Sequence, residues 1–187
     1  DFDKIANGGF DAVILAIGGK TRTLKVAEDG KNTLIYANDY LNGSKKAIGD
    51  KVVVIGGGIT GAETALELKN EGKDVTIVEM ADQFLASNSS ACQAYSISIS
   101  QTDIKIITGK RLVAAENGNA VVMDRWGNTT ELEADSIVIA AGFMPQYELA
   151  EQLENETELE VYNVGDSKQV RQIYDAIHEG FVAARQI

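Results

Sequence analysis

The sequence predicts an α/β fold, built on a parallel β-sheet with a small β-meander inserted into it. The run Lys51–Ile55 is apolar almost throughout and rich in β-branched residues, as expected of a parallel strand buried on both faces. A glycine-rich turn, residues 56–61, directly follows this run and precedes a helical pattern. Further along, residues 111–133 alternate short β-prone runs with turn signals at Asn117-Gly118 and Gly127-Asn128, which indicates the meander.

The first expected elements are two strands. Residues 13–17 form an apolar run that ends at Gly18-Gly19, and its short length favours a strand over a helix. A second β-prone run covers residues 33–36. Residues 11–18 and 135–142 share one pattern, an Asp, an apolar strand and a Gly, which suggests two equivalent structural positions.

The centre of the chain predicts a strand–helix–strand unit. The strand at 51–55 and the glycine turn lead into a helix expected over residues 62–71, which Gly72 ends. A second strand, residues 75–78, stops at Glu79. The crossover between two parallel strands of this kind is expected to be right-handed.

The remaining elements complete the sheet and close the chain. We expect a helix over 87–102, strands over 104–107, 136–141 and 161–164, and a last helix over 173–187. In that last helix one face carries the small and apolar residues Ile173, Ala176, Ile177, Gly180 and Ala184.

The turn Gly56-Gly57-Gly58-Ile59-Thr60-Gly61 has the G-x-G-x-x-G spacing of a Rossmann-like dinucleotide site, in the strand–turn–helix context that this motif requires. Gly56 permits the tight turn, Gly58 lets the backbone approach a pyrophosphate, and Gly61 lets helix and strand pack closely. The N–H groups at the start of the helix favour a diphosphate. Two alternatives stay open: an ordinary glycine-rich turn, and a site for the ADP half of FAD.

Glu79 lies 18 positions after Gly61, near the spacing expected for an acid that binds the adenosine ribose hydroxyls. A carboxylate there repels a 2′-phosphate, and residues 80–84 contain no Arg or Lys that would accept one. This favours NAD(H) over NADP(H). The alternative for Glu79 is an ordinary solvated acid at a strand end.

Composition excludes several function classes. With 187 residues and a formal net charge of −11, the chain is large enough for a core and too acidic to favour nucleic acid or an anionic membrane as partner. The single cysteine, Cys92, excludes an internal disulfide and a cysteine-only metal site, and it suits the reducing cytoplasm. No metal site is predicted. The chain begins at Asp1, close to strand-like sequence, so we expect it to be a piece of a longer protein.

The turn also resembles a known family. With Glu63 two positions after the third glycine, it is similar to the pyridine-nucleotide turn of two-dinucleotide flavoprotein reductases. Residues 11–18 and 135–142 resemble the motifs at which those enzymes cross between their FAD and NAD domains, and residues 161–166 resemble their late Gly-Asp motif. The resemblance implies cofactor-binding roles for Gly142, Gly165 and Asp166, with Asp166 near the flavin ribityl and pyrophosphate.

Residues 165–167 and 171–181 are similar to the ending of 2-enoate reductases and 2,4-dienoyl-CoA reductases, the long relatives of the old yellow enzymes. The resemblance covers nearly the whole chain. It implies a partial FAD-domain segment over 1–47, an NAD(H)-binding Rossmann domain over 48–142, and a returning FAD-domain segment over 143–187.

Several parts of those enzymes are missing from this sequence: the first FAD glycine turn, the FMN-binding barrel, the iron–sulfur cluster ligands and a redox-active cysteine pair. The resemblance therefore implies NAD(H) as the ligand of this chain, FAD in the full-length protein, and FMN and an iron–sulfur cluster only in the missing regions. The expected partners are the N-terminal FMN barrel and the first FAD half, and oligomerisation is left open. We assign no catalytic residue and expect the isolated chain to be inactive.

Five single residues have ordinary alternatives. Glu63 would be stabilised by the dipole at a helix start by ~0.3–1 kcal/mol, and this role competes with the implied one of facing the nicotinamide. Asp166 has the alternative of a turn acid. His178 and Cys92 are expected to have packing or surface roles, and Trp126 is expected to cover the meander.

Two functions follow for testing. In the first, the chain binds NADH and presents its hydride to FAD, for reduction of an activated alkene. In the second, it is a nucleotide-binding sensor or scaffold without turnover, or part of an NADH oxidase or a disulfide-reductase-like flavoprotein.

Overall fold

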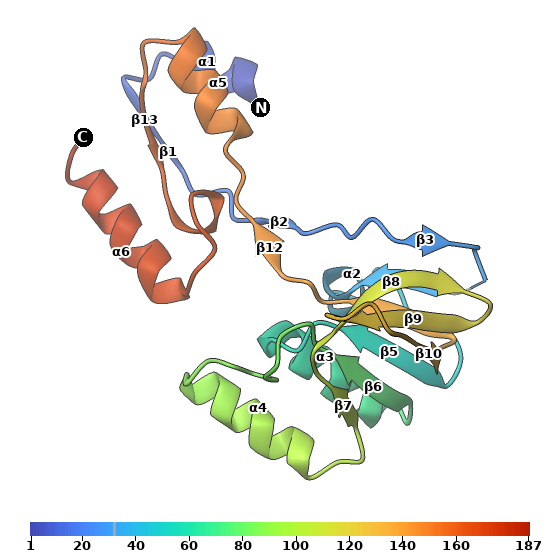
Figure 1. The fold of residues 1–187 in the computed structure, drawn as a ribbon. Helices are drawn as coiled ribbons and strands as arrows, with labels where there is room; N and C mark the ends of the chain where they lie inside the picture. The colour runs from blue at the N-terminus through green and yellow to red at the C-terminus, as the bar shows by residue number, and fades with distance from the viewer. Residues whose placement is uncertain (32) are drawn as a thin grey trace. The chain divides into compact units, whose positions relative to one another are not determined.

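The computed structural model describes residues 1–31 and 33–187 and divides the chain into two compact units, which are considered separately (Figure 1). Unit 1 combines residues 1–22 with residues 143–187, and unit 2 is residues 23–142. Within the described residues, no helix combines the length and apolarity that crossing a membrane requires.

Unit 2 is built on a five-stranded parallel sheet, which confirms the predicted α/β class. The strand order is β4-β11-β5-β6-β7. The strands are β4 (Thr33–Tyr36), β5 (Lys51–Ile55), β6 (Asp74–Val78), β7 (Lys105–Ile107) and β11 (Ser136–Ile139). All five were expected from the sequence, because parallel strands are apolar runs of this length.

Three helices cover one face of this sheet: α2 (Ala37–Leu41), α3 (Ile59–Asn70) and α4 (Ser90–Ser100). Alternate side chains of a strand point to opposite faces, so Val52 and Val54 of β5 pack with these helices. Helix α3 begins three residues earlier than the expected start at residue 62. Gly61 disfavours a helix in sequence-based reasoning, yet here it lies inside the first turn.

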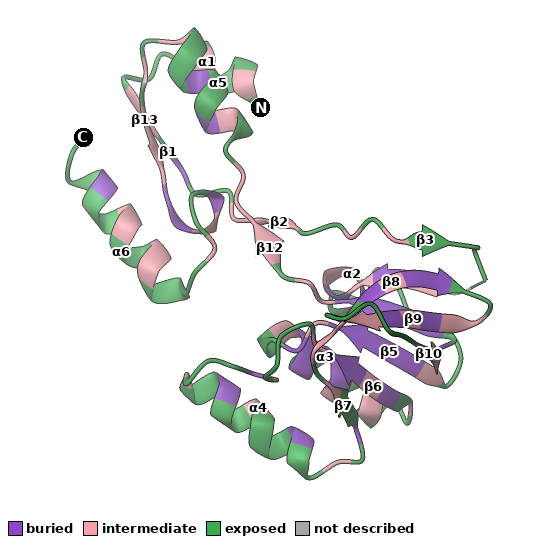
Figure 2. Ribbon diagram, viewed as in Figure 1, coloured by how far each residue is buried: buried purple, intermediate pink, exposed green. Residues whose placement is uncertain are grey.

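The meander covers the opposite face of the sheet. Its strands are β8 (Lys110–Glu116), β9 (Asn119–Asp124) and β10 (Thr129–Glu133), joined by two antiparallel pairings. Leu112 and Val122 of the meander share a core cluster with Val53 and Ile55 of β5. The short strand β3 (Ala27–Glu28), which was not expected, adds to β8 in parallel. Figure 2 shows the buried strands between these two layers.

Unit 1 has a much smaller core. Strand β1 (Ala12–Leu15) pairs in parallel with β13 (Glu160–Asn163), and β2 (Lys20–Thr21) pairs with β12 (Phe143–Met144). Its helices are α1 (Phe2–Ala6), α5 (Glu148–Glu156), the 3-10 turn η1 (Gly165–Ser167) and α6 (Ile173–Ala184). Leu15, Ala150 and Leu153 are the only buried members of its core cluster among the described residues.

Two sequence expectations differ from the structure here. Residues 23–47 were expected within a first segment of 1–47, but they lie in unit 2, because β3 and β4 pair with strands of that unit. The last helix was expected over 173–187 with one apolar face; α6 ends at Ala184, Ile173 and Ile177 of that face are exposed, and only Ala183 of this helix is buried. In the chain as described, no element covers that face.

The repeated Asp–strand–Gly pattern corresponds to similar local structures. Residues 12–15 and 136–139 each form a parallel strand, and Gly18 and Gly142 after them have φ angles of +73° and +83°. Glycine adopts this left-handed backbone without steric cost. Gly142 is the last residue of unit 2.

Candidate functional site

The glycine turn lies at the carboxyl end of β5, in the middle of the sheet. Gly58 is the N-cap of α3 and makes no side-chain capping bond, so the first N–H groups of this helix have no capping side chain. The first four N–H groups of any α-helix also lack a partner within the helix. Ile59, Thr60 and Gly61 therefore present backbone donors at the helix end that carries a partial positive charge.

The three motif glycines have different surroundings. A Cβ on Gly61 would lie 1.9 Å from the carbonyl oxygen of Gly56, and a Cβ on Gly56, where φ is +115°, would lie 2.3 Å from the carbonyl oxygen of Ala140. These two positions need glycine for the close approach of helix and strands. At Gly58 no atom lies within 4 Å of such a Cβ, so the backbone there faces open space. Of the three motif glycines, Gly58 is therefore the one where a ligand could approach the backbone without displacing protein atoms.

Glu79, at the end of the neighbouring strand β6, holds the loops around the turn. Its Oε2 accepts a hydrogen bond of 2.6 Å from the backbone N–H of Gly57, and its Oε1 accepts one of 2.6 Å from the N–H of Ala81. The carboxylate is half-buried and fixed beside the glycine turn. Each oxygen retains a further lone pair, so Glu79 can still accept hydrogen bonds from hydroxyl groups. This bridging role was not expected from the sequence.

The loop after Glu79 closes over the turn. The N–H of Leu85 donates to the carbonyl oxygen of Gly57 over 2.9 Å, and Phe84 is so close that a Cβ on Gly57 would lie 2.9 Å from its ring. Leu85 has a φ of +49°, a left-handed conformation that costs free energy in a leucine. Gly57 therefore serves this packing, while Gly58 stays open.

Glu63 lies in the first turns of α3 and is exposed. Its charge acts on Tyr95 of α4: burial raises the pKa of the Tyr95 phenol, and the negative charge of Glu63 raises it further. Glu63 thus lies on the side of α3 that faces α4. No ion pair of Glu63 is found among the described residues.

The sequence-predicted residues of unit 1 form a second, separate group. Asp166 accepts a hydrogen bond of 3.1 Å from the N–H of Arg171, in a hollow of about 240 Å³ that Gly18, Gly165 and Asp166 help to line. Gly165 has a φ of +66°, and a Cβ there would lie 3.1 Å from the Cβ of Ala176. Asp166 therefore stabilises the local turn through its bond to Arg171 and also lines the hollow.

Glu179 of α6 organises this group and was not predicted. Its Oε2 accepts a hydrogen bond of 2.8 Å from the N–H of Gly165, and its carboxylate forms an ion pair with Arg171. The Gly165 N–H, and to a smaller extent Arg171, hold the pKa of Glu179 below its usual value. Six positions separate Glu179 from the start of α6, so no local sequence motif indicates the contact.

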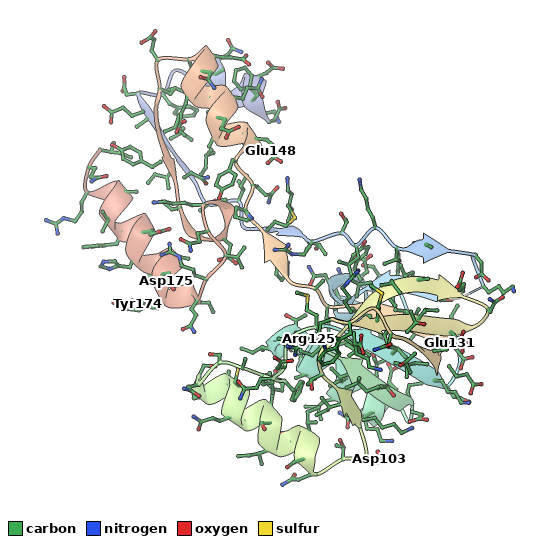
Figure 3. The ribbon with its side chains drawn as sticks, in the orientation of Figure 1. Asp103, Arg125, Glu131, Glu148, Tyr174 and Asp175 are labelled. Atoms are coloured by element: carbon green, nitrogen blue, oxygen red, sulfur yellow. The ribbon has the colours of Figure 1, made fainter. Side chains whose placement is uncertain are left out.

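The other singled-out residues have structural roles or none. Cys92 is buried, and its N–H donates to the hydroxyl of Ser89 over 3.2 Å, which caps α4. His178 stacks on Tyr174 with 6.0 Å between ring centroids, on the exposed side of α6 (Figure 3 labels Tyr174). Trp126 was expected to cover the meander, but it lies on the turn between β9 and β10 and is 77% exposed.

Within the described part of the chain, no cluster of three or more His, Cys, Asp or Glu residues could hold a metal ion.

Comparisons with known proteins agree with this architecture. Cinnamate reductase from Clostridium sporogenes is 32% identical over 99% of this chain, and NADH oxidase from Thermoanaerobacter brockii is 33% identical over 100% of it. The chain spans only 28% and 29% of the length of these two relatives. Among solved structures, a complex of 2-naphthoyl-CoA reductase with 2-naphthoyl-CoA matches with a TM-score of 0.85 and 28% identity, over 100% of this chain and 28% of that one.

The family model of the pyridine nucleotide-disulphide oxidoreductases matches residues 4–180, which takes in both units. The chain thus belongs to the pyridine nucleotide-disulphide oxidoreductase family, whose domains bind FAD and NAD(P)H.

Proposed function

We propose that this chain is the NADH-binding module of a flavin-dependent oxidoreductase that reduces an activated alkene of the enoate or dienoyl-CoA type. One observation carries the proposal. The open backbone at Gly58 caps α3, whose first N–H groups have no capping side chain, and the adjacent Gly57 is hydrogen-bonded to the carboxylate of Glu79. This arrangement suits a diphosphate next to a ribose diol.

Each residue of the turn then has a defined task. The backbone from Gly58 to Gly61, including Ile59 and Thr60, binds the diphosphate, and Gly56 and Gly57 shape the turn. Glu79 accepts hydrogen bonds from the adenosine ribose. Glu63, exposed on the next turn of the helix, faces the nicotinamide side. Gly165 and Asp166 of unit 1 belong to the FAD site. Gly142 is the last residue of unit 2, the NAD(H)-binding unit.

The alkene substrate is inferred from the relatives. Cinnamate and 2-naphthoyl-CoA, named in two of them, both carry a carbonyl group conjugated with carbon–carbon double bonds. When bound, the cofactors supply a hydride that, together with a proton, saturates such a bond. The residues of this chain bind and orient the cofactors and exclude water from them, while the cofactors carry out the electron transfer. FMN and an iron–sulfur cluster would belong to regions outside this chain.

Unit 1 supports the view that the first FAD half is a partner. Among the described residues, strands β1 and β13 pair only with each other, and the large apolar residues of α6 are exposed. Parallel strands are normally covered on both faces and paired on both sides. We infer that a preceding FAD-binding segment adds to this two-stranded sheet and covers α6, so that unit 1 forms the returning part of an FAD domain.

Calorimetric titration of the chain with NADH tests the proposal. Gly58→Ala should keep the fold, because the space is open and φ is −82°, but should weaken NADH binding about tenfold by filling the pyrophosphate position. Gly180→Ala is the matched control: it also adds a methyl group in open space, and it should bind like the wild type. No NADH binding at millimolar concentration, or equal affinity in both variants, would contradict the proposed site.

The acceptor is tested in a longer protein that includes the regions missing here. NADH oxidation should depend on an added cinnamate-type or dienoyl-CoA acceptor. The T. brockii relative, named as an NADH oxidase, motivates a parallel measurement with dioxygen as the acceptor. Turnover with dioxygen alone would favour an oxidase, and binding without turnover would favour a sensor or scaffold.

A further inference from the structure

A hollow of about 360 Å³ lies directly beside Glu79, at the carboxyl end of β6; we refer to it as the Arg125 hollow. It is lined by Met80, Ala81, Asp82, Gly109, Arg111, Met123, Asp124 and Arg125. Its connection to Glu79 is short, because the N–H of Ala81 donates to Glu79 and the N–H of Lys110 donates to the carbonyl oxygen of Glu79 over 3.1 Å. A group attached to the ribose at Glu79 would enter this hollow.

Two arginines of the meander face the hollow. Arg111 comes from β8 and Arg125 from the turn between β9 and β10 (Figure 3 labels Arg125). The residues that directly follow Glu79 contain no such cation, so the sequence alone indicated that no positive charge was available there. The meander thus brings guanidinium groups to a site that the local sequence leaves acidic.

Arg125 is held by two neighbours. Its guanidinium forms an ion pair with Asp82, and it lies 5.2 Å from the centre of the Trp126 ring. The other acid of the hollow, Asp124, is occupied by its own turn: it accepts hydrogen bonds of 2.9 Å from the N–H groups of Trp126 and Asn128. Its pKa is lowered, first by the Asn128 side chain. Asp82 is therefore the carboxylate that neutralises Arg125.

We propose that Asp82 determines the cofactor preference of this site by holding Arg125 away from the adenosine 2′-position. This inference rests on the proposed binding of NADH at the glycine turn. Together with Glu79, the hollow has three carboxylates against two guanidinium groups, which disfavours a 2′-phosphate and leaves the 2′-hydroxyl of NADH acceptable. Without Asp82, the numbers are equal and Arg125 is free to bind the phosphate.

The test compares NADH and NADPH on the 187-residue chain. Asp82→Asn should strengthen NADPH binding about tenfold, as expected for one new charge-assisted contact, and should leave NADH binding nearly unchanged. Removing the cation as well, in Asp82→Asn/Arg125→Ala, should abolish that gain. Trp126 is the one tryptophan of the chain, so energy transfer from Trp126 to the bound reduced nicotinamide reports binding of either nucleotide.

Asp103→Asn is the matched control. It removes the same charge and also an ion pair, with Lys69 at 2.7 Å, but it lies before β7 at the amino edge of the sheet. An equal NADPH gain in this variant would overturn the inference, because the effect would then follow the net charge alone. NADH binding in the wild type with no NADPH gain in Asp82→Asn would overturn it and leave the proposed function standing. No binding of either nucleotide to any variant would overturn both.

Discussion

The two units use the same kind of parallel strand with different amounts of cover. In unit 2 all four residues of β11 are buried, between helices on one face of the sheet and the meander on the other. In unit 1 no residue of β13 is fully buried, and α6 buries only Ala183. A parallel strand is stabilised mainly by cover on both faces. Unit 2 therefore has the core of a self-sufficient domain, and unit 1 has that of a domain still lacking neighbours.

The largest effect on stability is expected when one fully buried leucine is removed from each unit. Leu68 of α3 and Leu153 of α5 are both 0% exposed. Leu68→Ala should cost unit 2 about 3–5 kcal/mol, because its large core cannot collapse into the cavity, whereas Leu153→Ala should cost unit 1 about 2–3 kcal/mol. Urea titrations followed by amide NMR resolve the two units, because each amide reports on the unit that contains it. If each variant lowers the stability of both units equally, the chain unfolds as one body and the comparison fails.

A smaller effect concerns the carboxylate that ties α6 to η1. Glu179→Gln keeps an acceptor for the Gly165 N–H but loses the charge that pairs with Arg171, at a cost to unit 1 of about 1 kcal/mol. The side chain of Glu179 is 20% exposed, so solvent screens the pair only in part.

The same carboxylate predicts a pH dependence for unit 1. Because folding lowers the pKa of Glu179, its contribution is complete above the unfolded-state value of about 4.3 and is lost as the pH falls through the lower folded-state value. Urea titrations by NMR at pH 7 and at acidic pH should show a steeper loss for wild-type unit 1 than for Glu179→Gln. Unit 2 is the internal control, and equal slopes for the two proteins in unit 1 would contradict the assigned role.

The sequence predicted the longer strands of both units and missed the shortest ones. The five strands of the large sheet, β1 and β13 of unit 1, and the glycine turn were predictable, because apolar β-prone runs and the G-x-G-x-x-G spacing are local signals. The two-residue strands β2, β3 and β12 were not, because only tertiary contacts define pairs this short. Glu79 was recognised as an acid at a strand end, but its bond to Gly57 depends on how the loops after β5 and β6 meet. Arg125 lies 46 positions after Glu79, beyond any local motif.

The smallest expected effect comes from the exposed face of α6. Ile177 is 68% exposed, so Ile177→Gln should change the stability of unit 1 in this chain by no more than ~0.5 kcal/mol. In a longer protein that includes the inferred first FAD half, the same substitution should cost several times more, because it would then place a polar amide in an apolar contact. Thermal unfolding of both proteins measures the difference. A large loss in the 187-residue chain would mean that α6 is already packed there, and an equal, small change in both proteins would mean that the missing segment binds elsewhere.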